Sequence, residues 1–267
     1  GENPHQIGAL YKEIGKCEGS LTIAKQLNGK QLSFNNINDT NGALELLKEF
    51  DEPTVVACKH GNPCGVGSSN DIYDAWKKAF EADKTSIFGG IVVANREITK
   101  AVAQEMKEIF LEVIVAPSYE PEALEILQTK KNVRVLELPS ITVKQPENAL
   151  DIKKINGGII VQSIDSKLLD DYKVVTDRKP TDKELEDMLF TWKIVKYVKS
   201  NGIALGKDKQ SIGIGPGQVN RIWATEQSVE HAEELIGEGV TKGAVLASDA
   251  FFPFSDCVEA AHKAGIT

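Results

Sequence analysis

Apolar residues recur along this chain in short continuous runs, and between many of these runs they recur instead at every third or fourth position. Continuous runs are typical of strands buried in a sheet, and spaced positions are typical of helices with one apolar face. Strands are predicted at 54–59, 90–94, 113–116, 133–138, 158–162, 203–205 and 244–247. Strands that alternate with helices predict an α/β fold with mostly parallel sheets.

Capping residues mark where several predicted helices begin. Asn70 or Asp71 can cap the first of them. Thr181 and Glu184 form a capping box before a later apolar repeat. Pro121 suits the first turn of another helix. The helices predicted in this way cover 71–82, 102–110, 121–127 and the residues that follow 181.

The polar segment 163–180 has no apolar period and is the predicted joint between two domains, 1–170 and 171–267. The second half repeats the order of the first, in which a helix leads to a strand, a glycine-rich turn and later a strand that ends in an aromatic and proline turn. Both ends of the sequence look truncated. We therefore expect a fragment whose second domain is incomplete at its carboxyl end.

The chain has 267 residues, a formal net charge of −8 and a pI of about 5.2. This balance argues against broad binding to nucleic acids, although a local basic pocket would still accept an anionic substrate. No apolar run approaches the roughly 20 residues that a membrane helix needs, and no signal-peptide pattern opens the sequence. Four scattered cysteines indicate a reduced, cytoplasmic context.

Lys59 and His60 end an apolar run and are followed by Gly61, Gly65 and Gly67. Open α/β sheets bind ligands beyond the carboxyl ends of their strands, so this cation and this imidazole are expected in an active-site crevice. The imidazole can take a proton from an amine near pH 7, and the ammonium can stabilise an oxyanion. The glycines allow the backbone to approach a ligand or to turn sharply. The alternative is a surface lysine beside a hydrogen-bonded histidine.

His60 and the nearby Pro63-Cys64 also suggest a zinc deaminase-like hydrolase. The signature of those enzymes combines His-x-Glu with Pro-Cys-x-x-Cys. Asn62 stands in place of the glutamate and Gly67 in place of the second cysteine. The ligand set is therefore incomplete, and no metal is predicted.

A second glycine-rich stretch runs from 200 to 221 and ends in Arg221. Its alternating glycines expose backbone N–H groups, and the guanidinium of Arg221 can bind a carboxylate or phosphate through two hydrogen bonds. The stretch lacks the G-x-G-x-x-G pattern of dinucleotide-binding proteins. The alternative is a glycine-rich hairpin with a solvated arginine.

Three phenylalanines, at 251, 252 and 254, follow a predicted strand. They are candidates for stacking on a flat ring system, but the usual burial of phenylalanine favours a hydrophobic plug for at least two of them. The turn at 86–90 is similar, and residues 3–6 form another candidate ligand-facing loop.

Several strings of the chain are specific when taken together. They are GENPHQ, LSFNNIND, KHGNPCGVG, SIFGGIVVANR, VIVAPSYEPEAL, SNGIALGKDKQSIGIGPGQVNRI and SDAFFPFSD. In this order, and over the whole chain, they resemble the AICAR transformylase domain of the family of bifunctional purine biosynthesis enzymes that combine AICAR formyltransferase with IMP cyclohydrolase.

The resemblance implies a folate-dependent transferase that moves a formyl group from 10-formyltetrahydrofolate, its cosubstrate, to the 5-amino group of AICAR. The implied fold is a pair of cytidine-deaminase-like three-layer α/β/α subdomains that do not use zinc. The resemblance also implies a homodimer with shared active sites. A cyclohydrolase domain normally precedes this one in the family and is absent from this chain.

Site residues follow from the same resemblance. Lys59, His60 and Asn201 match the family's catalytic residues. His60 would relay the proton of the amine, Lys59 would stabilise developing charge, and Asn201 would donate to the carbonyl oxygen. The implied substrate-binding residues are Asn3, His5, Phe88, Glu112, Gln218, Arg221, Phe251 and Pro253, with Glu112 in place of the family's aspartate.

Two basic parts of the family pattern are missing from the sequence. An Arg-Tyr pair would stand just before Gly1, and a basic stretch would follow the last residue. If the molecule lacks both, phosphate binding and activity should suffer. The main alternative to the enzyme is therefore a truncated, non-catalytic fragment that binds the ribotide or only dimerises.

Overall fold

The computed structural model describes residues 1–15 and 17–267 of the chain. The described strands are β1 (Lys25–Asn28), β2 (Thr54–Lys59), β3 (Asn62–Ser68), β4 (Gly90–Ala94), β5 (Leu111–Ala116), β6 (Arg134–Glu137), β7 (Leu150–Ile155), β8 (Gly158–Ser163), β9 (Ile203–Lys207), β10 (Gln210–Gly215) and β11 (Val245–Ser248). The described helices are the 3₁₀ turn η1 (Leu21–Ile23), α1 (Phe34–Leu47), α2 (Ile72–Ala82), α3 (Lys100–Lys107), α4 (Pro121–Gln128), α5 (Asp182–Val195), α6 (Arg221–Leu235) and α7 (Asp256–Lys263).

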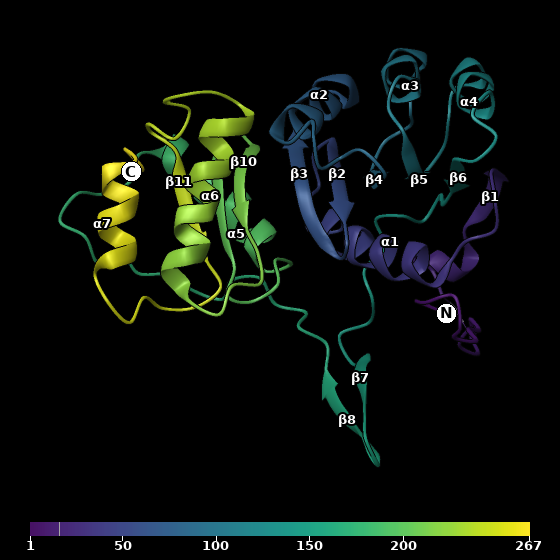
Figure 1. The fold of residues 1–267 in the computed structure, drawn as a ribbon, viewed down its shortest axis with the longest axis horizontal. Coiled ribbons are helices and arrows are strands. Elements are labelled where there is room, and N and C mark those ends of the chain that lie inside the picture. Colours follow the sequence, from purple (N-terminus) through teal and green to yellow (C-terminus); the bar gives the residue numbers. More distant parts are fainter. Residues whose placement is uncertain (16) are drawn as a thin grey trace.

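Nine of the described strands form one sheet, in the order β1-β6-β5-β4-β2-β3-β10-β9-β11 (Figure 1). The pairs β4–β5 and β5–β6 are parallel, and the other neighbours in the sheet are antiparallel. The mixed α/β class is therefore confirmed, but the prediction of mostly parallel sheets is wrong. The reason is that the glycine-rich segments after β2 and β9 are strands that fold back onto them.

Both of these hairpins turn through two residues with positive φ. His60 and Gly61 have φ of 53° and 73°, and Asp208 and Lys209 have φ of 52° and 56°. Two-residue loops with positive φ match the right-handed twist of the flanking strands. A helix follows each hairpin, α2 after β3 and α6 after β10. The two halves of the chain thus share a hairpin-and-helix unit, which agrees with the repeated order seen in the sequence.

The glycines of β3 and β10 serve helix packing instead of the expected approach to a ligand. A Cβ added to Gly65 would lie 2.0 Å from the carbonyl oxygen of Ala79 in α2. A Cβ added to Gly213 would lie 2.0 Å from the carbonyl oxygen of Ser228 in α6. Because real Cβ atoms cannot come that close to backbone, the helices lie on their strands only where glycine removes the side chain.

Replacing Gly65 by alanine is expected to lower the free energy of unfolding by about 1–3 kcal/mol, the usual cost of overpacking. The added methyl group would push α2 away from β3. Gly42 is the matched control, because a Cβ added to it inside α1 would meet nothing within 4 Å. Gly42→Ala should raise stability by up to about 1 kcal/mol through helix propensity. Urea unfolding of both variants measures the difference, and equal effects would contradict this packing role.

Helices cover both faces of the sheet, and most of the predicted helices are confirmed. One buried cluster joins α1 and α5 to one face, and another joins α2, α3 and α4 to the other face. The side chain of Asp71 caps α2, and Thr181 and Glu184 form the expected capping box of α5. Pro121 opens α4. α3 ends at Lys107, earlier than predicted, whereas α1, α6 and α7 were not predicted.

The strands β7 and β8 form a separate two-stranded hairpin that projects from the body of the molecule (Figure 1). The predicted strand at 158–162 therefore exists, but it pairs with β7 outside the main sheet. The residues between β8 and α5 contain neither helix nor strand. The division into domains 1–170 and 171–267 stays a prediction.

The base of this hairpin is tied to the body through Glu49. Its carboxylate accepts hydrogen bonds from Lys144 at 2.9 Å, from Lys196 at 3.0 Å and from the hydroxyl of Tyr197 at 2.9 Å. Lys196 also donates to the carbonyl oxygen of Asp165 at 2.9 Å. Lys144 precedes β7 and Asp165 follows β8, so one buried carboxylate and its partners hold both ends of the arm.

Two further sequence expectations concern the cysteines and membrane-spanning helices. All four cysteines are free thiols. None of the described helices has the length and apolar character needed to cross a membrane.

Candidate active site

Lys59 and His60 lie at the tip of the β2–β3 hairpin. The Nζ atom of Lys59 donates a hydrogen bond to the carbonyl oxygen of Phe88 at 2.7 Å. His60 is exposed and has a left-handed backbone conformation, which is uncommon for residues other than glycine. The hairpin therefore presents a held ammonium beside an accessible imidazole.

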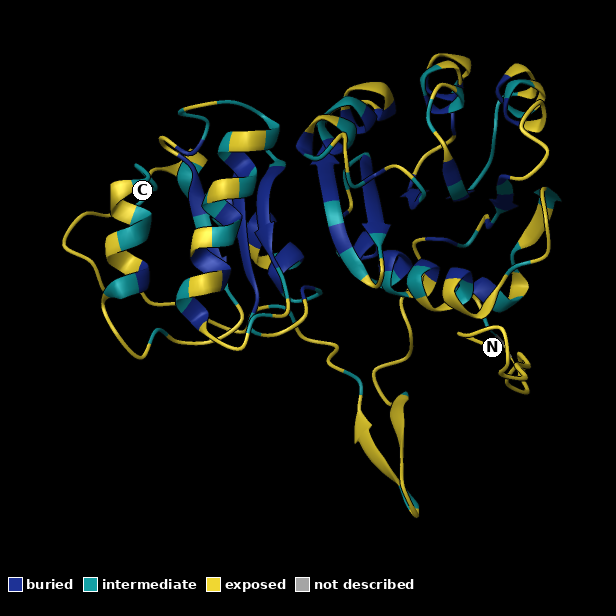
Figure 2. Ribbon diagram, in the orientation of Figure 1, coloured by how far each residue is buried: buried dark blue, intermediate teal, exposed yellow. Residues whose placement is uncertain are grey.

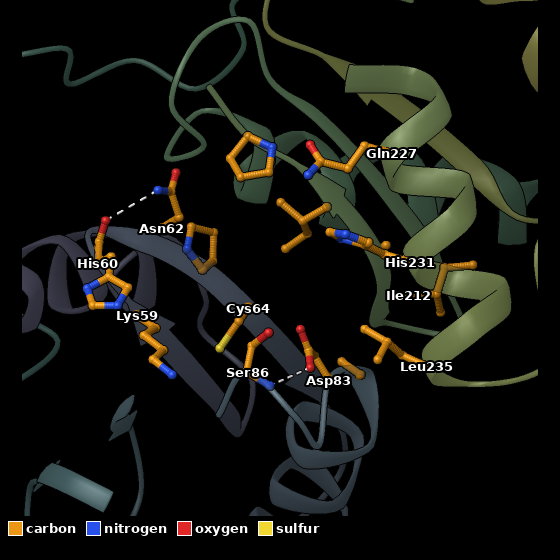
Figure 3. Close-up of a pocket in the computed structure, with 15 residues that line it drawn as sticks. Lys59, His60, Asn62, Cys64, Asp83, Ser86, Ile212, Gln227, His231 and Leu235 are labelled. Atoms are coloured by element: carbon orange, nitrogen blue, oxygen red, sulfur yellow. Dashed lines mark hydrogen bonds between the residues drawn. The ribbon is translucent and has the colours of Figure 1, made fainter. Parts of the chain in front are cut away.

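A cleft of about 280 Å³ opens beside this tip, between β3 and β10. The ladder between these two strands has a single described pair, Gly67 with Gln210, at the end of β3 far from His60. Figure 3 shows Lys59 and His60 on one side of the cleft, and Gln227 and His231 of α6 on the other. The cleft thus lies where the two halves of the sheet separate.

A second cleft, of about 270 Å³, borders the same two residues on the side of α1. Its lining is polar and includes Asn35, Asp39 and Glu112 together with Lys59 and His60. Glu112 accepts a charge-assisted hydrogen bond from the guanidinium of Arg134. The carboxylate of Glu112 therefore shares a cleft with Lys59, and Arg134 holds it in place.

Asn201 belongs to a second group of predicted site residues that hydrogen-bond to one another. Its Nδ2 donates to the carbonyl oxygen of Gln218 at 2.8 Å, and its Oδ1 accepts from the guanidinium of Arg221 at 2.7 Å. The Gln218 side chain donates to Gln227 at 2.9 Å. This network fixes the orientation of the Asn201 amide and leaves one of its N–H bonds without a partner in the network.

Arg221 is buried, with 9% of its side chain exposed, so the solvated arginine considered above is not what the fold contains. Its guanidinium forms an ion pair with Asp249 and donates to the carbonyl oxygen of Gly202 at 3.3 Å. Burial raises the pKa of Asp249, but hydrogen bonds from Ser200, Arg221 and Gly202 outweigh it and leave the pKa below its ordinary value. The charge of Arg221 is thus paired with the carboxylate of Asp249, and its guanidinium holds Asn201 in place.

One hydrogen bond joins the two groups across the cleft. The side-chain Oδ1 of Asn62, at the start of β3, accepts a hydrogen bond from the backbone N–H of Lys199 at 3.1 Å. Lys199 lies two residues before Asn201. The Lys59–His60 tip and the Asn201 network are therefore held side by side, although they are far apart in sequence.

The phenylalanine turn after β11 does not plug the core. Phe251 and Phe254 are 81% and 73% exposed, and Phe252 alone packs on a buried cluster. The expectation that at least two of the three are buried is therefore wrong, since the loop rises from the sheet edge beside Asp249. Pro253 is exposed as well.

Asn3 and His5 lie in the exposed amino-terminal segment, and neither is among the residues that line the two clefts beside Lys59. The hydrogen bonds of Asn3 go to Gln6 in the same segment. Within this single chain, no described hydrogen bond joins either residue to another predicted site residue.

No group of three or more described His, Cys, Asp or Glu side chains is placed to hold a metal ion. Burial raises the pKa of Cys58 to about 12, and it raises the pKa of Cys64 further still. Both thiols are therefore protonated near neutral pH and are poor nucleophiles or metal ligands. Lys59, His60 and Asn201 stay the candidate catalytic residues.

A model of the AICARFT/IMPCHase bienzyme family matches residues 1–231. The chain belongs to this family. Its whole length is similar to proteins named bifunctional purine biosynthesis protein PurH, at 60% identity in Acetivibrio thermocellus, 57% in Ruminiclostridium cellulolyticum and 54% in Caldicellulosiruptor saccharolyticus. The matched part is 51% of each relative, so the chain spans about half the length of the curated relatives it matches.

Family membership confirms the resemblance found in the sequence, but sequence reasoning missed three residues of this site. Asn62 and Asp249 stand inside the quoted strings KHGNPCGVG and SDAFFPFSD, and their role as internal acceptors appears only in the folded chain. His231 carries no signal in its local sequence, because it reaches the cleft only through the packing of α6 beside β10.

Proposed function

We propose that this chain, as part of a bienzyme of this family, transfers a formyl group from 10-formyltetrahydrofolate to the 5-amino group of AICAR in purine biosynthesis. The observation that carries the proposal is the placement of Lys59 and His60 beside the Asn201 network, joined through Asn62 and Lys199. Transfer of an acyl group to a weak amine needs a base for the amine proton and donors for the oxyanion, and these side chains can supply both.

In this mechanism the amine nitrogen attacks the formyl carbon, and a C–N bond forms. His60 removes the proton that the nitrogen can no longer keep. The bond between the formyl carbon and N10 of the folate then breaks, and N10 takes a proton. Lys59 has one N–H committed to the carbonyl oxygen of Phe88. Its two remaining N–H bonds are free to stabilise the oxyanion or to supply that proton.

Asn201 contributes the remaining donor in this proposal. Its Oδ1 is occupied by Arg221, so the amide cannot rotate without breaking a charge-assisted hydrogen bond. The unshared N–H of Nδ2 is thereby held for an oxyanion. Glu112, held by Arg134, would accept hydrogen bonds from the substrate in the polar cleft.

An assay with AICAR and 10-formyltetrahydrofolate tests the function. Release of tetrahydrofolate that depends on AICAR supports it. AICAR binding in calorimetry without any turnover would favour the non-catalytic fragment. The absence of both binding and turnover would overturn the proposal. We expect no metal requirement, and we expect the reaction to take place in the reduced cytoplasm.

We also infer that the active form is a homodimer, and the β7–β8 hairpin supports this. Leu150 and Ile152 of β7 share one face of the hairpin with Ile159 and Val161 of β8, and all four are exposed (Figure 2). A two-stranded hairpin is marginal alone, and such an apolar face favours a covering partner. Sharing between two copies would also complete a site that lacks Asn3 and His5 within one chain.

Charging this face is expected to convert the dimer into monomers. Ile152→Lys with Val161→Glu places opposite charges directly across the hairpin, so the hairpin itself keeps its pairing. Lys153→Gln, on the opposite face, is the control and should remain dimeric. Light scattering after size-exclusion chromatography gives the mass. A dimeric charged variant, or a monomeric wild type, would contradict the inference.

We further propose that the two hairpin-and-helix halves correspond to two cytidine-deaminase-like subdomains, with Phe251 and Pro253 beside the folate. The repeated hairpins and the helices on both faces of the sheet support the first part. The exposure of Phe251 supports the second, because an exposed ring is free to stack on a flat ligand.

A further inference from the structure

The side-chain amide of Asn62 is hydrogen-bonded at both of its ends. Its Nδ2 donates to the carbonyl oxygen of His60 at 3.3 Å, along the dashed line that joins the two residues in Figure 3. Its Oδ1 accepts from the backbone N–H of Lys199 at 3.1 Å. The first partner belongs to the turn that carries the proposed base, and the second belongs to the other half of the sheet. One side chain therefore joins the two halves beside the cleft that separates them.

Lys199 is part of the backbone that carries Asn201. Its carbonyl oxygen accepts a hydrogen bond from the N–H of Gly217 at 2.7 Å. Asn201 and Gln218 exchange two backbone hydrogen bonds, at 3.0 and 3.2 Å. The segment before β9 is thus paired with the segment after β10, like a short ladder. A shift of Lys199 relative to Asn62 would therefore carry Asn201 with it.

The end of the β3–β10 boundary far from His60 is held by several contacts. Gly67 and Gln210 form the described backbone pair of the two strands. The N–H of Val66 donates to the buried hydroxyl of Ser211 at 2.8 Å. The Nζ atom of Lys78 donates to a carbonyl oxygen of each half, at 3.0 and 2.7 Å. Any change in the angle between the halves would pivot about this fixed end and would be largest at the cleft.

Backbone pairing stops toward the other end, beside His60. Pro63 in β3 and Pro216 directly after β10 both line the cleft, and proline has no N–H to donate to a ladder. Among residues 62–65, Asn62 alone forms a described hydrogen bond with the second half of the sheet. At this end the separation of the halves therefore depends on a single side chain.

We propose that Asn62 is a positioning residue whose amide sets the separation between the His60 turn and the loop that carries Asn201. The inference rests on the proposed formyl transfer and deepens it. With the far end fixed at Gly67 and Gln210, this amide decides how close the base and the oxyanion donor come. In the zinc deaminase signature the same position holds an acid–base glutamate. In this chain it holds an amide that binds two backbone groups instead.

Asn62→Ala removes both hydrogen bonds and is expected to lower kcat for formyl transfer by about 10–100-fold, because a misplacement of about 1 Å can cost a positioned reaction roughly 10²-fold. The KM for AICAR should stay within about threefold, since Asn62 does not line the polar cleft that holds Glu112. Tetrahydrofolate release by the complete protein gives both constants, and urea unfolding shows that the variant is folded. A near-normal kcat in folded Asn62→Ala would overturn the inference.

A double-mutant cycle tests whether Asn62 acts through the loop that carries Asn201. In a protein that already carries Asn201→Ala, the further change Asn62→Ala should lower kcat by less than about threefold, because the donor that Asn62 positions is already gone. A general loss of structure would instead lower kcat by the same factor in both backgrounds. Equal factors would therefore overturn the inference.

Ser211→Ala is the matched control, because it removes a hydrogen bond between the same two strands at the fixed end, away from the cleft. It should lower the urea midpoint but leave kcat within about twofold. If Ser211→Ala slows the reaction as much as Asn62→Ala, any loosening of the sheet has that effect and the inference is wrong. Absence of turnover in the wild type would instead count against the proposed function itself.

Discussion

Replacing His60 is expected to lower kcat for formyl transfer by about 10²–10⁴-fold, the usual contribution of a positioned general base. Alanine removes the imidazole that would take the proton of the amine. Because His60 has a φ of 53°, alanine also strains the hairpin turn, so His60→Asn is the sharper variant. Asparagine tolerates this backbone conformation but cannot act as a base near neutral pH.

Tetrahydrofolate release under saturating substrates measures the effect, and calorimetry shows whether AICAR still binds. We expect binding to change little in His60→Asn, because the residue acts on the transferring proton. His262→Ala removes another exposed histidine, on α7, and serves as the control with unchanged rate. Near-normal turnover in His60→Asn would exclude His60 as the base, and another group would then have to remove the proton of the amine.

Replacing Arg221 by methionine is expected to lower the free energy of unfolding by about 1–3 kcal/mol, because the half-covered carboxylate of Asp249 loses its cation and a charge-assisted hydrogen bond. Asn201 would also lose the donor that orients its amide. We therefore expect a lower kcat even under conditions where the variant is folded. Urea unfolding and the formyl-transfer assay, measured on the same sample, separate the two effects.

Two comparisons make this prediction sharper. Arg178→Met breaks an ion pair with Glu184 in which the arginine is exposed to solvent, and it should cost much less stability than Arg221→Met. Adding Asp249→Asn to Arg221→Met should recover part of the stability, because no carboxylate is then left without its cation. If Arg221→Met unfolds at the same urea concentration as the wild type, the ion pair does not stabilise this part of the fold.

The ion pair also predicts a pH dependence. The pKa of Asp249 is lower in the folded chain than its ordinary value. Its contribution to stability is therefore complete above the unfolded pKa, near 4 for aspartate, and is lost as the pH falls through the lower folded pKa. The stability difference between the wild type and the doubly substituted Arg221→Met, Asp249→Asn protein should shrink in that acidic window.

Local signals in the sequence determined many of the elements of the fold. Asp71 and the Thr181–Glu184 capping box marked the starts of α2 and α5, because a cap needs only neighbours within one turn. The continuous apolar run at 54–59 marked β2, and the short strings marked the family. These signals are contained in a few consecutive residues, so they can be read without knowing what packs against them.

The direction and pairing of strands were decided by tertiary structure. Gly65 and Gly213 suggest flexible loops when read alone, yet they lie in strands because a helix backbone occupies the space that a side chain would need. The sequence contains the glycines but not the helices that lie on them. The expectation of mostly parallel sheets failed at these two hairpins for that reason.

For this protein, the sequence by itself determined the family, the α/β class and the identities of Lys59, His60 and Asn201 as candidates. Tertiary structure decided which of the candidates meet. It placed His60 at a hairpin tip, it paired the buried Arg221 with Asp249, and it left Asn3 and His5 outside the two clefts that Lys59 and His60 line. The physical reason is that contacts between residues far apart in sequence depend on how the two halves of the sheet pack, which no local pattern encodes.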